Sequence, residues 1–300
     1  MRRTAAVAAA KVAAGLSRRF RFGGGTALPG LVAERIDPEI ISGLASSLGQ
    51  GSVLVTGTNG KTTTARLLGN IVHAAGMETV ANRAGSNMMR GIASALVEAA
   101  GWGGGFEAGD RKLGVFEVDE ATVPEAAWAV RPRVVLFTNL FRDQLDRYGE
   151  VEYVAEVWRK AVAAWPSVVT LVLNADDPAV ASLGRHATGR VVYYGLKDRA
   201  LGASALEHAA DARWCTGCGA ELSYAAVFYG HLGHWRCARC GNERPMVDVG
   251  GAGVTSDEDG MSISISLADA EITVQLPLTG LYNAYNVLAA AATASAAGVE

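Results

Sequence analysis

The chain has 300 residues, 50% of them hydrophobic and 19% charged, which suits one large domain or two ordinary ones and argues against disorder. The formal net charge of −3 gives no overall attraction to nucleic acid. No run of about 18 uninterrupted apolar residues occurs, so the sequence predicts no transmembrane helix.

The N-terminal stretch MRRTAAVAAAKVAAGLSRRFRFGGG superficially resembles a signal peptide. Lys11 interrupts its apolar run, and Arg18, Arg19 and Arg21 follow without a convincing cleavage site. The pattern favours a surface helix with a basic end. A weak contact with an anionic membrane surface stays open as the alternative.

Short β-branched runs then alternate with longer stretches rich in alanine and leucine. We expect helices at 61–75, from about 88 and at 149–165, and strands at 52–57, 78–83, 112–120, 133–140, 168–178 and 189–195. This alternation predicts an α/β fold with a mostly parallel, doubly wound sheet. The apolar runs lack strict alternation, as expected for strands covered on both faces.

The pattern changes beyond residue 195. All four cysteines lie within 211–246, and residues 261–278 alternate like a β-hairpin. The last segment is an alanine-rich helix that reaches the final residue without a capping signal. We therefore expect that the chain stops before its natural end or continues in a further domain.

The stretch VLVTGTNGKTTTARLL places a glycine loop between a strand and a helix, the context of a phosphate-binding loop. Its end fits the pattern G-x-x-x-x-G-K-[ST], but Val55 stands where the first glycine belongs, and the preceding glycine is Gly57. Backbone N–H groups at the helix N-terminus favour phosphate oxygens. The alternative is a glycine turn that opens an ordinary helix. The nucleotide-binding residues predicted here are Gly57, Thr58, Asn59, Gly60, Lys61, Thr62 and Thr63.

Within this loop, Lys61 would neutralise the β- and γ-phosphates of ATP, and Thr62 could hold Mg²⁺. A second magnesium contact is expected from a carboxylate at the carboxyl end of the third strand, where α/β sheets bind ligands. Glu117 is the favoured residue, and Asp119 and Glu120 are weaker candidates, because acidic residues often simply end strands and begin helices.

The segment TNLFRDQLDRYG also follows a strand, and it is too polar for a mere connection. Its polar side chains include Asn139, Arg142, Asp143, Gln144 and Asp146.

The cysteines are spaced C-x₂-C-x₁₈-C-x₂-C, within the range of zinc ribbons, and each pair is followed by glycine. Four thiolates would make a closed, structural Zn²⁺ site formed by Cys215, Cys218, Cys237 and Cys240. The alternatives are two disulfides or free thiols. The chain lacks a secretory signal and is expected in a reducing compartment, where persistent disulfides are rare.

His231 and His234, between the two pairs, are expected to be surface or packing residues rather than ligands. The ribbon's arginines permit nucleic-acid binding, but the ATPase context argues against such a partner. These arginines are Arg213, Arg236, Arg239 and Arg244.

Together these motifs resemble the Mur ligase family, ATP-dependent enzymes that join a carboxylate to an amine. GTNGKTTT is similar to its variant phosphate loop, FTNLFRDQLD to its T-N-x-x-x-D-H-L-D segment, and LNADDP recurs after the next strand. GLYNAYNVLAAAA resembles the helix whose two asparagines approach the adenine, here Asn283 and Asn286. The resemblance covers residues 52–297 and implies ATP and Mg²⁺ as cofactors.

Two positions depart from that family. The histidine that usually ligates a second Mg²⁺ is replaced by Gln144, whose amide oxygen is a weaker ligand. Where many members carry a carbamylated lysine, this chain has Trp158, and Lys160 is out of phase on the helix. The resemblance therefore leaves a second magnesium site open.

The departures, the inserted cysteine segment and the stretches GGGTALPGLVAERIDP and NRAGSNMMRGIASAL are similar to one branch, the MurT subunits of lipid II isoglutaminyl synthase. That resemblance implies a heterodimer with the glutaminase GatD, which supplies ammonia. It implies amidation of the α-carboxylate of D-glutamate in the stem peptide of lipid II, in the cytoplasm at the inner face of the membrane.

The resemblance also implies a division of the chain. Residues 1–50 would be a short N-terminal segment, and 51–300 a central ATP-binding domain with the ribbon inserted at about 211–246. The family's C-terminal domain, which contacts the glutaminase and is expected to supply an aspartate to it, would be absent, leaving the chain inactive alone.

The mechanism implied is attack of the substrate carboxylate on the γ-phosphate, giving an acyl phosphate that ammonia then resolves. Lys61, Glu117 and Arg142 are the predicted catalytic residues, and Thr62 and Glu117 the magnesium ligands. Lys61 and Arg142 would stabilise the charge on the transferred group. The alternatives are a ligase of the Mur or folylpolyglutamate type that adds an amino acid, and a non-catalytic nucleotide-dependent binding module.

Overall fold

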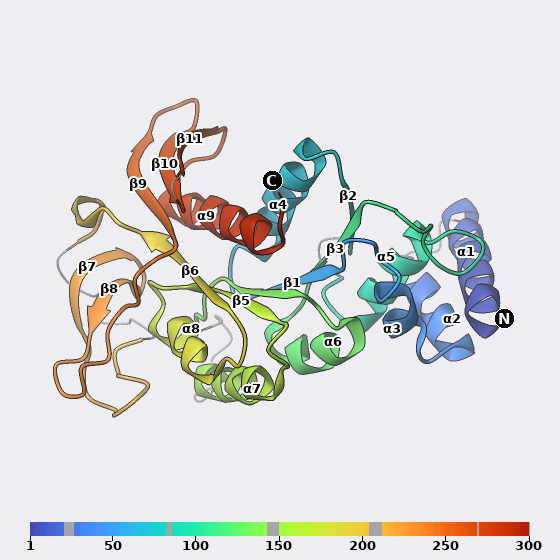
Figure 1. Cartoon of the computed structure of the whole chain (residues 1–300), viewed down its shortest axis with the longest axis horizontal. Coiled ribbons are helices and arrows are strands. Elements are labelled where there is room, and N and C mark those ends of the chain that lie inside the picture. Colours follow the sequence, from blue (N-terminus) through green and yellow to red (C-terminus); the bar gives the residue numbers. More distant parts are fainter. Residues whose placement is uncertain (21–26, 83–85, 143–149, 204–211, 269, 300) are drawn as a thin grey trace.

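A central sheet organises the chain (Figure 1), whose computed structural model describes residues 1–20, 27–82, 86–142, 150–203, 212–268 and 270–299. In this part the sheet has nine strands in the order β11-β10-β9-β6-β5-β4-β1-β3-β2. The strands from β2 to β9 run parallel, and β10 and β11 add an antiparallel edge. Their bounds are β1 (Ser52–Thr56), β2 (Glu78–Ala81), β3 (Lys112–Glu117), β4 (Val134–Phe137), β5 (Thr170–Asn174), β6 (Val191–Leu196), β9 (Val249–Ser256), β10 (Met261–Leu267) and β11 (Ala270–Leu276).

The two faces of this sheet carry separate hydrophobic cores, because successive side chains of a strand point to opposite faces. In β1, Leu54 belongs to one core, whereas Val53 and Val55 belong to the other. Helices α4 (Lys61–Ala74) and α9 (Leu281–Ala296) cover the face of Val53 and Val55. The predicted α/β fold with a mostly parallel, doubly wound sheet is confirmed, as is the hairpin expected at 261–278.

Further helices bury their apolar sides in the core of Leu54, on the opposite face of the sheet. They are α1 (Arg2–Phe20), α2 (Leu28–Ile36), α3 (Ile40–Ala45), α5 (Met89–Ala99), α6 (Val123–Val130), α7 (Glu150–Ala164) and α8 (Pro178–Ser182), with 3₁₀ turns at Glu120–Thr122, Leu183–His186 and Arg199–Leu201. In Figure 1, α1 to α3 lie at the β2 end of the sheet. A small hairpin of β7 (Ser223–Tyr229) and β8 (Leu232–Arg236) lies beside β6, on the other side of the view.

The expected N-terminal helix is present, and its alanine-rich side is buried: Ala6, Val7 and Ala10 are fully inaccessible. Arg2 and Arg3 donate hydrogen bonds to backbone oxygens of the following helices, so these two charges also tie α1 to the fold. The side chains of Arg18, Arg19 and Arg21 lie outside the described residues, and the alternative of a membrane contact stays a prediction. Among the described residues, no helix combines the length and apolar character that crossing a bilayer requires.

Trp158 on α7 anchors the core on the face of Leu54. Its ring packs edge-on against Phe137 at the end of β4, with ring centroids 4.9 Å apart, and only 1% of the residue is exposed. Its indole Nε1 donates to the backbone oxygen of Glu120 at 2.9 Å, so the buried polar atom is satisfied.

We predict that Trp158→Ala lowers the free energy of unfolding by about 3–5 kcal/mol, because it empties a buried aromatic site. Chemical denaturation followed by circular dichroism measures this loss. Trp128→Ala is the matched control, since Trp128 is 80% exposed, and it should cost less than about 0.5 kcal/mol. Equal losses in the two variants would contradict the assigned packing.

Candidate active site

The phosphate loop joins β1 to α4 at the point where the strand order of the sheet reverses. β1 lies between β3 and β4. Helix α4, which follows β1, covers one face of the sheet, whereas α6 and α7, which follow β3 and β4, cover the other, so a crevice is expected at the carboxyl end of β1. Gly57 and Gly60 both have positive φ, at 133° and 84°. A Cβ on Gly57 would lie 2.1 Å from Thr138 Oγ1, and one on Gly60 would lie 2.2 Å from Asn286 Oδ1. A side chain at either position would overlap these atoms, so both positions favour glycine.

Asn139, which follows β4, holds the loop in place. Its backbone oxygen accepts from the N–H of Thr58 at 3.0 Å. Its side-chain amide makes two hydrogen bonds to the backbone of Asn59: Oδ1 accepts from Asn59 N at 2.9 Å, and Nδ2 donates to Asn59 O at 3.0 Å. Thr138 Oγ1 also donates to Asn59 O, at 2.9 Å. The sequence marked this segment as too polar for a connection, and the structure shows that it positions the loop.

Lys61 lies folded over the loop that it would use to bind phosphate. Its Nζ donates to the backbone oxygen of Gly57 at 2.6 Å and to that of Thr58 at 3.4 Å. The same Nζ lies 3.6 Å from Glu120 Oε1. The ammonium group is thus placed at the mouth of the loop with an acidic neighbour. Glu120, one of the two weaker magnesium-ligand candidates of the sequence analysis, therefore lies close to the phosphate loop.

The two predicted magnesium ligands touch each other. Thr62 Oγ1 donates to Glu117 Oε2 at 2.7 Å, and Glu117 is 4% exposed at the end of β3. Burial raises the pKa of the Glu117 carboxyl above its ordinary value, and the hydrogen bond from Thr62 opposes this shift. A hydroxyl and a carboxylate beside phosphate-binding amides are hard oxygen ligands, which fit Mg²⁺.

Asn82 is a residue of this site that the sequence analysis missed. It follows β2, and its side-chain amide pairs with the backbone of Glu117: Oδ1 accepts from Glu117 N at 2.8 Å, and Nδ2 donates to Glu117 O at 2.9 Å. It therefore fixes the strand end from which the carboxylate projects. The sequence signal was only its place after a strand, which many structural residues share.

The segment after Asn139 holds the other polar residues that the sequence predicted for this site. Arg142 is exposed at the end of a described range. Asp143, Gln144 and Asp146, the last three polar residues predicted in this segment, lie outside the described residues.

The position of the family's carbamylated lysine belongs to the core. Trp158 is buried there, as described above, whereas the side chain of Lys160 is 71% exposed and pairs with Glu156 at 3.3 Å. Neither side chain faces the phosphate loop, as the helical phase of Lys160 predicted.

A cavity of about 340 Å³ opens directly beside the loop. Asn59, Gly60 and Thr63 of the loop line it, together with Asn286 of α9. Asn286 Oδ1 accepts from Thr64 Oγ1 at 3.3 Å, and its Nδ2 donates to Asn283 Oδ1 at 3.0 Å. The two predicted adenine-binding residues are therefore paired with each other and with the helix that the loop begins. The other lining residues are Thr138, Asn139, Tyr194, Tyr229, Leu232, Tyr282 and Tyr285.

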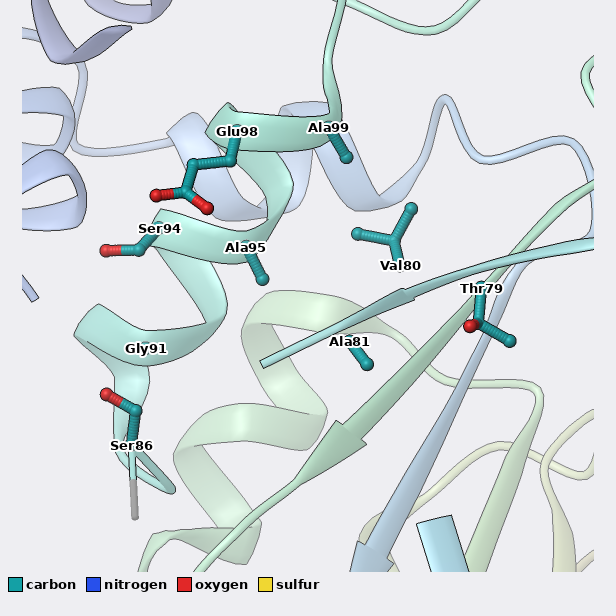
Figure 2. A pocket seen from close by; sticks show the side chains of 9 residues that line it. All are labelled: Thr79, Val80, Ala81, Ser86, Gly91, Ser94, Ala95, Glu98 and Ala99. Atoms are coloured by element: carbon teal, nitrogen blue, oxygen red, sulfur yellow. The ribbon is translucent and has the colours of Figure 1, made fainter. Parts of the chain in front are cut away.

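A second cavity, of about 290 Å³, lies between β2 and α5 at the outer edge of the sheet. Figure 2 shows that small side chains dominate its lining, including Ser86, Ser94 and Ala95. It holds none of the predicted site residues, so the cavity beside the phosphate loop is the candidate nucleotide site.

The four cysteines of the ribbon converge, with all ligand atoms within 4.8 Å of one another. The Sγ atoms of Cys215 and Cys240 are 3.6 Å apart, and those of Cys218 and Cys237 are 3.5 Å apart. Four thiolates around a tetrahedral zinc at about 2.3 Å would be about 3.8 Å apart, so the cluster is compatible with zinc. In the described part of the chain, neither predicted non-ligand, His231 or His234, belongs to this cluster.

The protonation of Glu117 gives a test of the site in metal-free, nucleotide-free protein. A carboxyl whose pKa is higher in the folded than in the unfolded state destabilises the fold once it ionises, so stability falls as pH rises between those two values. Glu117→Gln should therefore be more stable than the parent at neutral pH and lose that pH dependence, yet bind magnesium–nucleotide more weakly.

Thermal unfolding across a pH series and calorimetric nucleotide titration measure the two effects. Glu152→Gln is the control, since Glu152 is exposed on α7 and should change neither. A Glu117→Gln protein that is less stable than the parent at neutral pH would contradict the buried-charge assignment.

Comparison with curated proteins points to one group. The chain is 33% identical over 292 residues to "Lipid II isoglutaminyl synthase (glutamine-hydrolyzing) subunit MurT" of Staphylococcus aureus (strain COL), covering 97% of this chain and 62% of that protein. The subunit of the same name from Streptococcus pneumoniae (strain ATCC BAA-255 / R6) is 32% identical over 291 residues, with 96% and 62% covered. The chain thus spans about three fifths of the length of these relatives.

Solved structures agree on the fold. A pseudomurein peptide ligase type C from Methanothermus fervidus superposes with a TM-score of 0.68 at 30% identity, covering 87% of this chain and 48% of that one. MurF from Acinetobacter baumannii, at 16% identity, shares the fold with a TM-score of 0.59 over 92% and 46%. The family model of the Mur ligase middle domain matches residues 55–216, more than half of the chain. On this match, with the loop, strand ends and helix α9 arranged as described, the chain belongs to the Mur ligase family.

Proposed function

We propose that this chain provides the ATP-dependent ligase site of a lipid II isoglutaminyl synthase. The observation that carries the proposal is the contact between Thr62 and Glu117 beside the phosphate loop, which assembles a site for magnesium–ATP. The choice of substrate rests on the relatives named as MurT subunits of that synthase, which match nearly the whole chain.

In the proposed reaction, an oxygen of the D-glutamate α-carboxylate attacks the γ-phosphorus of ATP, and the bond to the bridging oxygen breaks, releasing ADP. The nitrogen of ammonia then attacks the acyl carbon, phosphate leaves, and the amide forms with loss of a proton. Lys61 and Arg142 would balance the negative charge that spreads over the transferred group. Magnesium, held by Thr62 and Glu117, would supply further positive charge at the phosphates.

The partner and the place of action follow from the same proposal. A synthase named as glutamine-hydrolysing needs a subunit that releases ammonia, for which we propose a GatD-type glutaminase in a heterodimer. Lipid II is anchored in the membrane, so we place the reaction at its cytoplasmic face. The boundary at residue 50 and the additional C-terminal domain stay predictions.

Lys61→Ala should lower amidation by about a hundred-fold or more, because it removes the charge at the transferred phosphate. The full-length protein, purified with its glutaminase, is incubated with lipid II, ATP, magnesium and either glutamine or ammonium. Mass spectrometry of the stem peptide separates the amide from the acid. Lys160→Ala, an exposed lysine on α7, is the matched control and should keep full activity.

Three outcomes would overturn the proposal. Amidation retained by Lys61→Ala would remove the loop from the chemistry. A product extended by an amino acid instead of ammonia would identify the peptide-forming type of ligase. Nucleotide binding without any turnover on lipid II would favour the non-catalytic binding module.

The cysteine cluster is proposed to hold zinc. The backbone supports this, because Gly219 and Gly241, after the two pairs, adopt positive φ values of 68° and 73° that turn the chain tightly. We expect about one zinc per chain by elemental analysis, and thiolate-to-metal absorption after replacement with cobalt. Cys237→Ser should lower the zinc content, whereas His234→Gln should not. Loss of zinc in the histidine variant would show that the ligand set is wrong.

A further inference from the structure

The tip of the β7–β8 hairpin reaches into the cavity beside the phosphate loop. Tyr229 and Leu232, on either side of the turn, line the cavity together with Tyr282 and Tyr285 of α9. The hairpin belongs to the cysteine ribbon, which is distant in the sequence from the phosphate loop. The match to the Mur ligase middle domain ends at residue 216, so these two lining residues lie beyond it.

Buried contacts fix this tip against the polar turn after β5. His231 is 1% exposed, and its Nε2 lies 3.2 Å from Asp177 Oδ2. The ring of His231 packs on Phe141, with centroids 4.4 Å apart, and Phe141 follows Asn139 in the segment that positions the phosphate loop. Trp235 Nε1 donates to the backbone oxygen of Ala175 at 3.0 Å. The hairpin is therefore docked on the turn at the carboxyl end of β5, at the side of the sheet where the phosphate loop lies.

The carboxylate of Asp176 joins the ribbon to α9. Its Oδ1 accepts from Arg244 Nε, at the base of the ribbon, and its Oδ2 accepts from the hydroxyl of Tyr285 at 2.8 Å. Asp176 is fully buried, so its charge is compensated only by such partners. The ribbon and α9 are thus linked to each other beside the cavity.

The wall that these elements form is aromatic and partly exposed. Tyr229 is 44% exposed and Tyr282 is 53% exposed, and their ring centroids lie 6.4 Å apart. Exposed aromatic faces of this kind bind flat heterocycles by stacking, with little dependence on their hydrogen-bonding groups. Gly60 and Thr63 of the phosphate loop line the same cavity.

We propose that the ribbon completes the nucleotide site, with Tyr229 stacking on the base of the nucleotide whose phosphates lie on the loop. The proposal rests on the proposed function as far as the ligand is a nucleotide. It also makes the metal cluster part of nucleotide binding. Cys218 precedes β7 and Cys237 follows β8, so the cluster clamps both ends of a two-stranded hairpin that alone would be marginally stable.

The test compares two probes on the full chain, ADP and inorganic tripolyphosphate, each titrated with magnesium in a calorimeter. Tyr229→Ala should weaken ADP binding about ten-fold and leave tripolyphosphate binding unchanged, because only ADP has a base. Tyr229→Phe should keep the affinity for ADP. Tyr153→Ala, at a 65% exposed tyrosine on α7, is the matched control and should change neither.

Each outcome decides something different. If the unaltered chain binds neither probe, the proposed function fails before the role of the ribbon is reached. If it binds both, and Tyr229→Ala leaves ADP affinity intact or weakens both probes equally, the stacking role is refuted.

Removal of the metal gives the second arm. After chelation, with far-ultraviolet circular dichroism confirming that the main fold persists, ADP affinity should fall as in Tyr229→Ala while tripolyphosphate still binds. Unchanged ADP affinity in metal-free protein would refute the dependence on the cluster. If the metal-free chain unfolds, Tyr229→Ala alone decides the proposal.

Discussion

The arrangement of this molecule depends on the hydrogen bonds that the buried carboxylate of Asp176 accepts. It lies just past β5, without exposure to solvent, and accepts hydrogen bonds from the backbone of Leu196, the hydroxyl of Tyr285 and the guanidinium of Arg244. An isolated buried charge would be costly, so the three donors must stay in place for the fold to be stable. They come from β6, from α9 and from the ribbon, which meet at the crevice of the sheet.

Around that crevice, the phosphate loop is held by amide side chains rather than by packing alone. Asn139 fixes Asn59, Asn82 fixes the backbone of Glu117, and Asn286 fills the space that the missing side chain of Gly60 leaves. Each amide satisfies donors and acceptors that would otherwise be buried without partners. These hydrogen bonds within the protein hold the loop and the end of β3 in one arrangement, and such order lowers the entropy lost when a ligand binds.

Much of this could be predicted from the sequence where local signals are strong. The strand before Gly57, the helix from Lys61 and the 261–278 hairpin are all where the pattern placed them. Strand β9 was missed because its sequence, VGGAGVTS, is rich in glycine. The structure gives the reason: a Cβ on Gly251 would lie 2.8 Å from Leu288 Cδ1, so α9 packs too closely for larger residues. Helices α2, α3 and α6 are short and carry too few residues to show a period.

The sequence by itself determined which motifs the chain carries: a glycine loop between a strand and a helix, a carboxylate at a strand end and two cysteine pairs at metal-binding spacing. Each of these signals lies in one or two short stretches of the chain and can be read without the fold. Only the tertiary structure decided which distant segments share a cavity. That Tyr229 of the ribbon faces Tyr282 of α9 follows from the docking of the hairpin on β5 and β6. Such contacts depend on the packing of elements far apart in the chain, and no local pattern of residues records them.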